Sequence, residues 1–268
     1  MQLDDKVVLV TGASAGIGRA IAARAGAAGA RVLVHGRDEE RTRLVAAEVD
    51  GFPLVADLSV GAERARLCDE ALEQFGRVDV LVNNAGVGWA GPLTEMTVAQ
   101  LRAVIEVDLL AALELTHELL PPMVNRGEGA ICFVSSIAGR TGVAGEAVYS
   151  AAKAGVDMFA ESLRAETAGT GVGVSVVVPG AVSTGFFETR GRPYTRSRPR
   201  PVPPEDVANA VLTTITRGRA EAWVPGWLRI APAVRVLAPG AYRQLSTRFG
   251  EQVRVSPEPN HTSHEGAS

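Results

Sequence analysis

Residues 6–18 read Lys-Val-Val-Leu-Val-Thr-Gly-Ala-Ser-Ala-Gly-Ile-Gly, and this stretch decides the fold. Its apolar, β-branched part, Val7–Val10, is typical of a buried strand. Gly16 and Gly18 follow, and the Ala-rich residues 19–28 have good helix propensity. In a strand–glycine turn–helix unit, the unpaired N–H groups and the positive dipole end of the helix attract a nucleotide phosphate. The same glycines also fit an ordinary tight turn, whereas the lack of a Lys-Ser/Thr pair after Gly18 argues against a P-loop.

The bulk composition describes a globular chain that can bury a full core. Of 268 residues, 46% are hydrophobic and 21% are charged, which excludes global disorder. The net charge of −3 gives no reason to expect a nucleic-acid partner. The two cysteines, Cys68 and Cys132, form no close pair, and no metal site is predicted. With neither an apolar signal region nor a membrane-length apolar run, we expect a cytoplasmic protein.

Short apolar runs recur along the chain, with helix-length stretches between them. The runs expected to form strands are residues 7–10, 31–35, 53–56, 78–82, 130–134, 174–178 and 222–224. Apolar runs that alternate with helices indicate a parallel sheet covered on both faces and joined by right-handed crossovers. We therefore expect one Rossmann-like α/β domain over residues 1–250, with a doubly wound parallel sheet of about seven strands.

Three further segments carry structural expectations. Residues 98–120 are amphipathic and predict one long helix, which the Pro121-Pro122 pair should stop. From about residue 226 to 249, apolar residues alternate with arginines, which is typical of an amphipathic helix. Such a helix could lie on an anionic membrane surface, cover a substrate pocket or form a subunit contact. Residues 251–268 are polar and predict a disordered tail.

Polar residues at two strand ends suggest contacts with a dinucleotide. In such folds the end of the second strand meets the adenosine ribose, and an acidic residue there selects NAD. Here Gly36 and Arg37 occupy that place, and an arginine fork suits the 2′-phosphate of NADP. Arg37 could equally be a solvated loop residue, and the adjacent Asp38 keeps that alternative open. Asp57, after the third strand, could accept a hydrogen bond from adenine or cap the next helix.

A second group of polar residues predicts a reactive centre. Asn84 and Gly86 follow the fourth strand and Ser136 follows the fifth, at the sheet edge where ligands bind. Tyr149 and Lys153 have the i, i+4 spacing that places both side chains on one face of a helix. An ammonium beside a phenol lowers the phenol's pKa and makes it a usable general acid or base.

Together these residues resemble the classical short-chain dehydrogenase/reductase family, over roughly residues 5–225. The motifs that carry the resemblance are Thr11-Gly12-x-x-x-Gly16-x-Gly18, Asp57, Asn83-Asn84-Ala85-Gly86, Ser136, Tyr149-x-x-x-Lys153 and Pro179-Gly180. The resemblance implies hydride transfer between a nicotinamide and a carbonyl or alcohol carbon of a hydrophobic small molecule. Tyr149 would be the general acid/base, Ser136 would bind the substrate oxygen, and Lys153 would hold the nicotinamide ribose.

The resemblance also implies which residues bind the cofactor, NADP(H) in preference to NAD(H). They are Gly12, Ser14, Gly16, Ile17, Gly18, Arg37, Asp57, Leu58, Asn84, Ala85, Gly86, Tyr149, Lys153, Pro179, Gly180, Val182 and Thr184. The chain departs from the family at Asp108, where asparagine is usual and assists a proton relay through its main-chain carbonyl. Asp108 therefore joins the catalytic candidates, and we expect activity to be retained. Ala15 stands where many NADP-preferring members have a basic residue, so the NADP preference depends on Arg37.

The substrate side is less defined. An apolar pocket is expected from Trp89, Ile137, Val143 and Phe186, with residues 190–204 as a mobile lid. The resemblance implies a homodimer or homotetramer, and residues 226–249 could add a peripheral membrane contact. The alternatives to an enzyme are a nucleotide-binding regulatory protein or a membrane-surface protein with little turnover.

Overall fold

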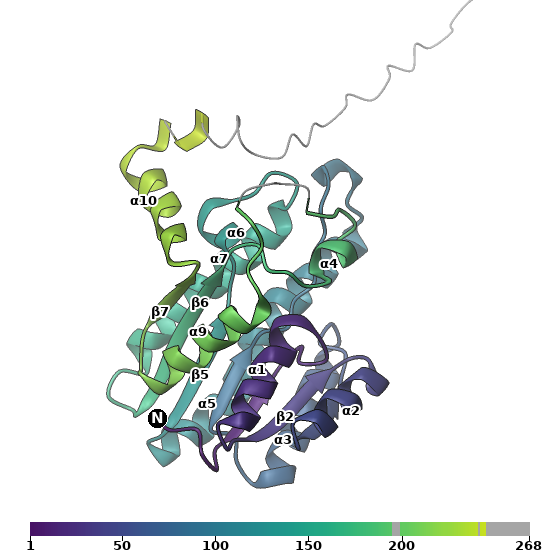
Figure 1. Ribbon diagram of the computed structural model, residues 1–268, viewed down its shortest axis with the longest axis vertical. Helices are drawn as coiled ribbons and strands as arrows, with labels where there is room; N and C mark the ends of the chain where they lie inside the picture. Colours follow the sequence, from purple (N-terminus) through teal and green to yellow (C-terminus); the bar gives the residue numbers. More distant parts are fainter. Residues whose placement is uncertain (195–198, 241, 245–268) are drawn as a thin grey trace, which may run out of the picture.

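The computed structural model describes residues 1–194, 199–240 and 242–244. A seven-stranded sheet runs through the centre of the molecule in the order β3-β2-β1-β4-β5-β6-β7 (Figure 1). All neighbouring strands are parallel. The strands are β1 (Val7–Val10), β2 (Arg31–Gly36), β3 (Phe52–Val55), β4 (Val80–Asn83), β5 (Gly129–Val134), β6 (Val172–Pro179) and β7 (Glu221–Val224). The predicted doubly wound sheet is confirmed, with strand ends shifted by one or two residues.

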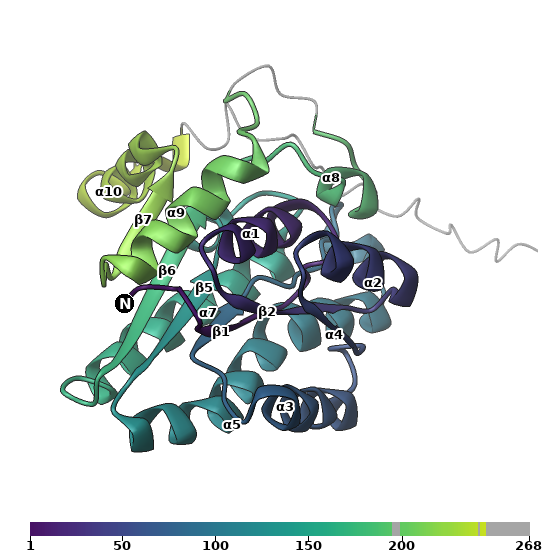
Figure 2. The ribbon, with the colours of Figure 1, turned by 60° about the horizontal axis from the view of Figure 1, so that its bottom comes forward.

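Helices cover both faces of the sheet (Figure 2). One layer contains α1 (Gly16–Ala27), α2 (Glu39–Glu48) and α9 (Pro204–Thr216), and its core includes Ile21, Val45 and Val211. The opposite layer contains α3 (Gly61–Phe75), α4 (Val98–Ile105), α5 (Ala111–Arg126) and α7 (Ala147–Glu166), with Leu67, Leu115 and Val156 in its core. Because the strands are buried on both sides, their sequences are continuous apolar runs rather than alternating ones.

The strand order reverses beside β1, which pairs with β2 on one side and β4 on the other. The crossovers from β1 and β4 therefore leave in opposite directions. Their carboxyl ends border a crevice, which is the usual ligand site of such sheets.

The predicted helix over residues 98–120 is wrong in detail, and so is the stop at the prolines. The stretch divides into α4, a π-helical turn, η2 (Glu106–Leu110), and α5, which continues through Pro121 and Pro122 to Arg126. Each proline removes one helical N–H, which normally costs about 3 kcal/mol. Here the prolines face outward while Leu119 and Met123 are fully buried, so core packing holds the helix until Gly127 ends it in a left-handed conformation.

The region after β7 is also less regular than predicted. It forms a 3₁₀ turn, η3 (Gly226–Arg229), and a two-turn helix, α10 (Ile230–Leu237), and residues 241 and 245–249 of the predicted amphipathic segment lie outside the described residues. The predicted tail, residues 251–268, lies outside the described residues, as do residues 195–198 of the expected lid. None of the described helices is both long enough and apolar enough to span a membrane.

Candidate functional site

The glycine turn after β1 is shaped by close contacts as well as by its backbone angles. Gly12 and Gly16 have φ of +65° and +54°, a region that favours glycine. A Cβ at Gly18 would lie 2.2 Å from the Gly12 carbonyl oxygen, so no other residue fits there without moving the turn. Ala15 precedes α1 and has no side-chain acceptor for the first N–H groups of the helix. The turn therefore presents bare N–H groups, as a phosphate site requires.

Hydrogen bonds join this turn to the loop after β4. The Thr11 hydroxyl accepts from the N–H groups of Asn84 (2.9 Å) and Ala85 (3.0 Å). The Asn84 side-chain amide donates to the Thr11 carbonyl oxygen at 2.8 Å. The loops after β1 and β4 thus form one unit at the crevice, and the Asn84 side chain serves to hold that unit together.

The adenosine end of the crevice is an open depression of about 550 Å³, bordered by Arg37, Asp38, Arg41 and Asp57, together with Val55, Ala56 and Glu63. Arg37 is exposed, and Arg41 forms an ion pair with Asp38 at 3.0 Å. Arg41 is not among the predicted site residues, although its i, i+4 spacing from Arg37 is a signal that could have found it. Two guanidinium groups therefore border this depression.

Asp57 closes a turn ahead of α3. Its carboxylate accepts hydrogen bonds from the N–H (2.9 Å) and the hydroxyl (2.8 Å) of Ser59, and both bonds lower the pKa of Asp57. Val60, not Asp57, is the N-cap of α3, so the helix-capping alternative is wrong. Asp57 still borders the depression, so the predicted adenine contact stays a prediction.

His35 connects the glycine turn to the end of β3. Its Nδ1 accepts a hydrogen bond from the Gly12 N–H at 3.2 Å, so its Nε2 carries the proton and donates to the Ala56 carbonyl oxygen at 3.1 Å. Burial lowers the pKa of His35 from 6.5 to about 4, so the ring is neutral at pH 7. The residue positions the turn and holds no reactive proton.

The predicted catalytic residues come together at the carboxyl ends of β4 and β5. Ser136 begins the short helix α6 (Ile137–Thr141), and its hydroxyl accepts from the Ala138 N–H at 3.1 Å. Tyr149 and Lys153 lie one turn apart on α7, with the Lys153 ammonium 5.7 Å from the centre of the Tyr149 ring. Lys153 is buried and donates to the Val134 carbonyl oxygen at 3.3 Å.

Asp108 changes the electrostatics of this group. One carboxylate oxygen accepts from the Val87 N–H at 2.7 Å, and the other lies 3.4 Å from the Lys153 ammonium. Burial raises the pKa of Asp108 to about 6, against the attraction of Lys153. Burial also raises the pKa of Tyr149, the Asp108 charge raises it further, and a hydrogen bond with Ser136 lowers it. The pKa of Tyr149 therefore lies above its ordinary value, whereas the spacing with Lys153 predicts a lower one, and the Lys153 ammonium is paired with Asp108.

The residues predicted to contact nicotinamide follow β6. The Gly180 N–H donates to the Val224 carbonyl oxygen at 2.8 Å, and a Cβ at Gly180 would lie 2.8 Å from the Leu228 side chain. Val182 is buried and pairs with Val202. A Cβ at Gly16 would lie 3.1 Å from Thr184, so this segment closes the crevice against the glycine turn.

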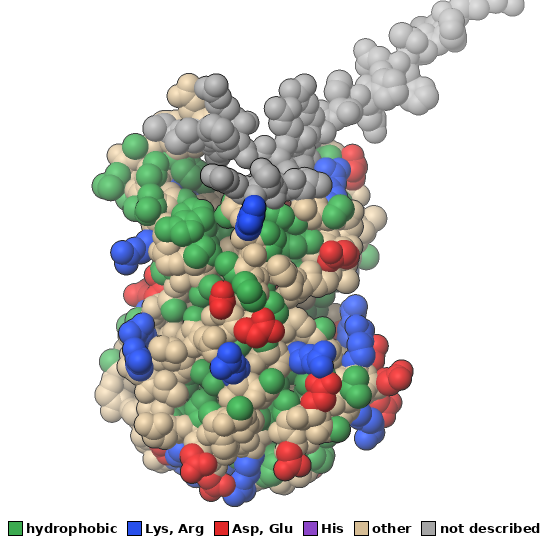
Figure 3. All heavy atoms as spheres, in the orientation of Figure 1, with side chains coloured by type: hydrophobic (Ala, Val, Ile, Leu, Met, Phe, Trp, Pro, Cys, Tyr) green, Lys and Arg blue, Asp and Glu red, His purple; other side chains and the backbone are tan. Residues whose placement is uncertain are grey.

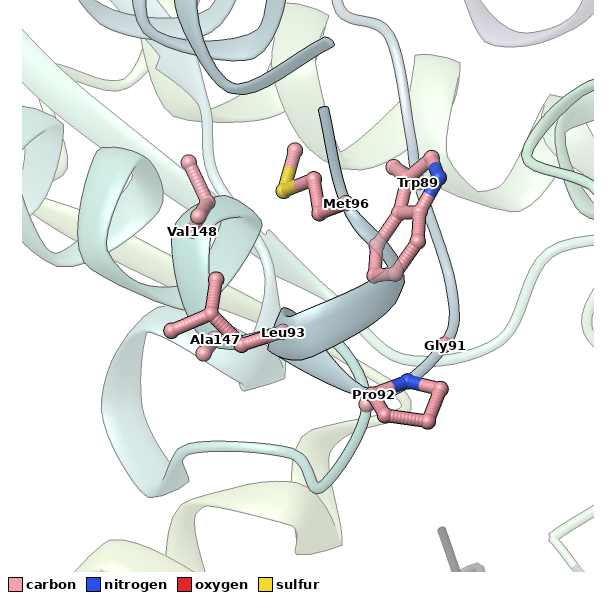
Figure 4. A pocket seen from close by; sticks show the side chains of 8 residues that line it. Trp89, Gly91, Pro92, Leu93, Met96, Ala147 and Val148 are labelled. Atoms are coloured by element: carbon pink, nitrogen blue, oxygen red, sulfur yellow. The ribbon is translucent and has the colours of Figure 1, made fainter. Parts of the chain in front are cut away.

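An apolar pocket of about 200 Å³ lies beside the catalytic group. Figure 4 shows Trp89, Leu93 and Met96 facing Ala147 and Val148 at the start of α7. Of the four residues expected to line the substrate pocket, only Trp89 lines this one. Phe186 lies in α8 (Phe186–Thr189) and packs on Tyr149, with ring centres 5.5 Å apart. The place of Val148 next to Tyr149 in the sequence is the signal that could have predicted part of this lining.

This fold and site define a class of protein: a dinucleotide-binding α/β protein with a Ser–Tyr–Lys group at its crevice. Comparison with known proteins gives the family, because the family model for short chain dehydrogenase matches residues 6–194. The chain belongs to the short-chain dehydrogenase/reductase family and is an oxidoreductase.

Individual relatives agree with this assignment. Ketoacyl reductase HetN from a Nostoc species is 36% identical over 224 residues, which are 82% of this chain and 78% of that protein. A short-chain dehydrogenase from Sphingobium yanoikuyae in complex with NADPH is 26% identical, with a TM-score of 0.78, covering 95% of this chain and all of that one. A 3-ketoacyl-(acyl-carrier-protein) reductase from Brucella melitensis complexed with NADH is 27% identical, with a TM-score of 0.77, covering 83% and 97%.

The relatives support a nicotinamide dinucleotide cofactor, and the residues of this chain fit one. The glycine contacts, the uncapped start of α1 and the open depression at Arg37 follow one another along the crevice. A pyrophosphate needs bare N–H groups and close backbone approach, and both are present.

Proposed function

We propose that this protein is an NADP(H)-dependent oxidoreductase that transfers a hydride between nicotinamide and a carbonyl or alcohol group of a hydrophobic small molecule. The observation that carries the proposal is the convergence of Ser136, Tyr149 and Lys153 beside the glycine turn. A protein that only binds a nucleotide has no need for a buried lysine behind a tyrosine next to an apolar pocket.

In the reduction direction, Tyr149 would donate its hydroxyl proton to the substrate carbonyl oxygen, and a bound reduced nicotinamide would supply the hydride to the carbon. In the oxidation direction, the Tyr149 phenolate takes the alcohol proton. Ser136 donates a hydrogen bond to the substrate oxygen in both directions. Lys153 would bind the nicotinamide ribose and orient the cofactor beside Tyr149.

The preference for NADP(H) is supported by the two arginines at the adenosine end. Arg37 is exposed beside the depression, and Arg41 stands one turn further along. The carboxylate of Asp38 is already paired with Arg41, so it repels a 2′-phosphate less than an unpaired acid would. An arginine can hold a phosphate with two parallel hydrogen bonds.

The apolar lining supports a hydrophobic substrate. Trp89, Leu93, Met96 and Val148 offer no charged group to a ligand. Phe186 covers Tyr149 from the other side, and the buried ion pair of Arg190 with Glu146 holds the segment after α8 against the loop before α7. We therefore expect a substrate that carries its carbonyl group on an apolar skeleton. This skeleton would enter between the segment after α8 and the loop before α7.

The first experiment is a fluorescence titration of the purified protein with NADPH and NADH, followed by a panel of apolar ketones and aldehydes. Micromolar NADPH binding, weaker NADH binding and NADPH-dependent turnover are expected. Tighter NADH binding would mean that Arg37 is a solvated surface residue that does not bind the cofactor. If neither dinucleotide bound, the enzyme proposal would be overturned in favour of a structural or interaction role.

A homodimer or homotetramer is also proposed. Val98 and Leu101 on α4 and Met158 on α7 are exposed, and these two helices pack side by side. Sedimentation velocity should give a species larger than the 28.0 kDa chain, and Met158→Glu should shift it toward the monomer. A monomer at micromolar concentration would contradict the proposal.

A peripheral membrane contact is supported by the surface of η3 and α10. Trp227, Ile230, Val236 and Leu237 are all more than half exposed, and Figure 3 shows apolar side chains gathered over α10 at the upper left. No Asp or Glu occurs from residue 222 to 250, whereas four arginines do. An apolar face with cations and an interfacial tryptophan suits an anionic lipid surface.

Flotation with phosphatidylserine vesicles tests this contact. The full chain should float with the vesicles, and a Trp227→Ser/Leu237→Ser variant should not. Equal flotation of both proteins, or of neither, would overturn the contact.

A further inference from the structure

Asp108 occupies an unusual position. It lies in the π-helical turn η2, where the helix between α4 and α5 widens, a feature frequent at functional sites. Its residue surface is 2% exposed. One carboxylate oxygen accepts from the Val87 N–H, but the other has no hydrogen-bond partner among the described residues. Burying a carboxylate oxygen without a hydrogen bond costs free energy, so the ionised form of Asp108 depends on the charge that lies nearest to this oxygen.

That nearest charge is the Lys153 ammonium, 3.4 Å from the second oxygen. Both groups border Gly86, where an added Cβ would lie 3.0 Å from the Asp108 oxygen and 3.5 Å from the Lys153 nitrogen. The lysine thus stands between the Val134 carbonyl, Asp108 and the Tyr149 ring. The ammonium charge therefore acts on both the Asp108 carboxylate and the Tyr149 phenol.

Arg64 on α3 is held by Glu106 and Glu114. Asp157 on α7 is paired with Arg140. Burial raises the pKa of Asp157 and the Lys153 charge lowers it, but Asp157 forms no ion pair with Lys153 among the described residues. The groups that lie exposed on α4 and α5 are Arg102, His117, Glu118 and Arg126. The electrostatic environment of Tyr149 is therefore set by the pair of Lys153 and Asp108.

We propose that Asp108 is a positioning residue: by pairing with Lys153 it cancels most of the ammonium field at Tyr149 and keeps the phenol protonated to higher pH. This inference rests on the proposed function, because it assigns a consequence to Tyr149 as the acid/base. It adapts the site to carbonyl reduction over a wide pH range, since reduction consumes the protonated phenol and oxidation consumes the phenolate.

The sign follows from the charges. Burial alone opposes the phenolate, and an unpaired lysine would favour it. With Asp108 ionised, the two nearest charges sum to zero, and burial prevails. The carboxyl has a pKa of about 6, so it is ionised throughout the range in which Tyr149 titrates. Replacing it by asparagine keeps an acceptor for the Val87 N–H but leaves a net positive charge, which lowers the pKa of Tyr149.

The kinetic test is the pH profile of Asp108→Asn. A charge within about 4–6 Å of a titrating group shifts its pKa by about one to three units. The Lys153 ammonium lies 5.7 Å from the centre of the Tyr149 ring. The pH at which reduction declines should therefore fall by at least about one unit. Oxidation at neutral pH should rise by about tenfold, because the phenolate fraction rises with the same shift. The overall equilibrium constant stays unchanged.

A second readout needs neither substrate nor cofactor. Phenolate absorbance of the free protein, titrated with base, identifies Tyr149 as the signal lost in Tyr149→Phe. Its midpoint should fall in Asp108→Asn and also in Asp108→Ser, a second neutral variant in case the first folds poorly. Asp157→Asn is the matched control, because it removes a buried carboxylate that is paired with Arg140. Its Tyr149 midpoint should move by much less than in Asp108→Asn, because Asp157 is paired with Arg140 and, in the part of the chain that the structure describes, forms no ion pair with Lys153.

Coincident midpoints for wild type and both Asp108 variants would overturn the inference. An equal shift in Asp157→Asn would do the same, because the effect would then be a general one of negative charge. Shifted midpoints without turnover of any carbonyl would overturn the proposed function and leave the link between Asp108 and Tyr149 standing.

Discussion

The two ends of the crevice hold charge in opposite ways. At the catalytic end, Lys153 and Asp108 are 4% and 2% exposed, and each has a fixed partner. At the adenosine end, Arg37 and Arg41 lie in contact with solvent. Because water screens charges far more than a protein interior does, one charge removed from the first end should matter more than one removed from the second. The comparison therefore predicts that residues at the first end affect the rate of the reaction and that residues at the second end affect which cofactor is bound.

The largest effect is expected at the catalytic end, from Tyr149→Phe. It removes the proton donor and keeps the ring that packs on Phe186. General acid catalysis contributes about 10²–10⁴ in rate, so kcat should fall by about a thousandfold while NADPH affinity stays within about threefold. Tyr242→Phe is the matched control, because its hydroxyl bonds only the Thr141 carbonyl in the described contacts. If Tyr149→Phe kept more than a tenth of the wild-type kcat, Tyr149 would not be the general acid/base.

The middle of the crevice should be nearly as sensitive to added volume. Gly18→Ala places a methyl group 2.2 Å from a carbonyl oxygen, and such overpacking costs about 1–3 kcal/mol. We expect NADPH affinity to fall by about ten- to a hundredfold, measured by fluorescence titration. Gly173→Ala in β6 is the control, because no atom lies within 4 Å of its added Cβ. Equal affinities for the two variants would contradict the close contact.

At the adenosine end, Arg37→Asp should invert the cofactor preference. It removes a phosphate ligand and adds an acid that can bind the ribose 2′-OH of NAD. The ratio of NADPH to NADH affinity should fall by about ten- to a hundredfold, and Arg41→Ala should lower it less, since Arg41 is shared with Asp38. An unchanged ratio in Arg37→Asp would show that this end does not select the cofactor.

The stability of the folded protein should depend on pH through His35, which connects the glycine turn to the end of β3. Its folded pKa of about 4 lies below its unfolded value near 6.5, so the unfolded chain binds the proton more tightly. The stability that His35 contributes is complete above about pH 6.5 and is lost as the pH falls toward 4. Between pH 7 and 5 this amounts to about 2 kcal/mol in the free energy of unfolding.

His35→Gln keeps an acceptor for the Gly12 N–H and has no titrating group in this range. Urea unfolding at both pH values should therefore show a smaller loss of stability in the variant, by about 2 kcal/mol. Identical losses in both proteins would mean that His35 is already protonated in the folded state.

The sequence predicted what depends on local patterns and missed what depends on packing. Continuous apolar runs such as Val7–Val10 predicted the sheet, and the spacing of Tyr149 and Lys153 predicted that both lie on one face of α7. The helix stop predicted at Pro121-Pro122 is wrong, because the burial of Leu119 and Met123 stabilises α5 by more than the lost hydrogen bonds cost.

The candidate site shows the same division. The motif order placed the predicted residues around one crevice, but the expected lowering of the Tyr149 pKa depends on a charge balance that spacing does not show. Asp108 reaches Lys153 across 45 positions of sequence, and only the fold determines that its carboxylate faces the ammonium. The apolar pocket shows a similar limit, since Met96 and Val148 meet only after α7 packs against the loop that follows β4.

The hydrogen bonds that join Thr11 to Asn84 have a consequence for the order of folding. They connect residues 73 positions apart, and both are needed to shape the glycine turn. Contacts of such long range form late, because the intervening loop must first lose its freedom. A partly folded chain with β1 and α1 but no β4 thus lacks the phosphate site. Dinucleotide affinity during refolding should therefore appear only when the centre of the sheet has closed, and the ligand then stabilises that last step by mass action.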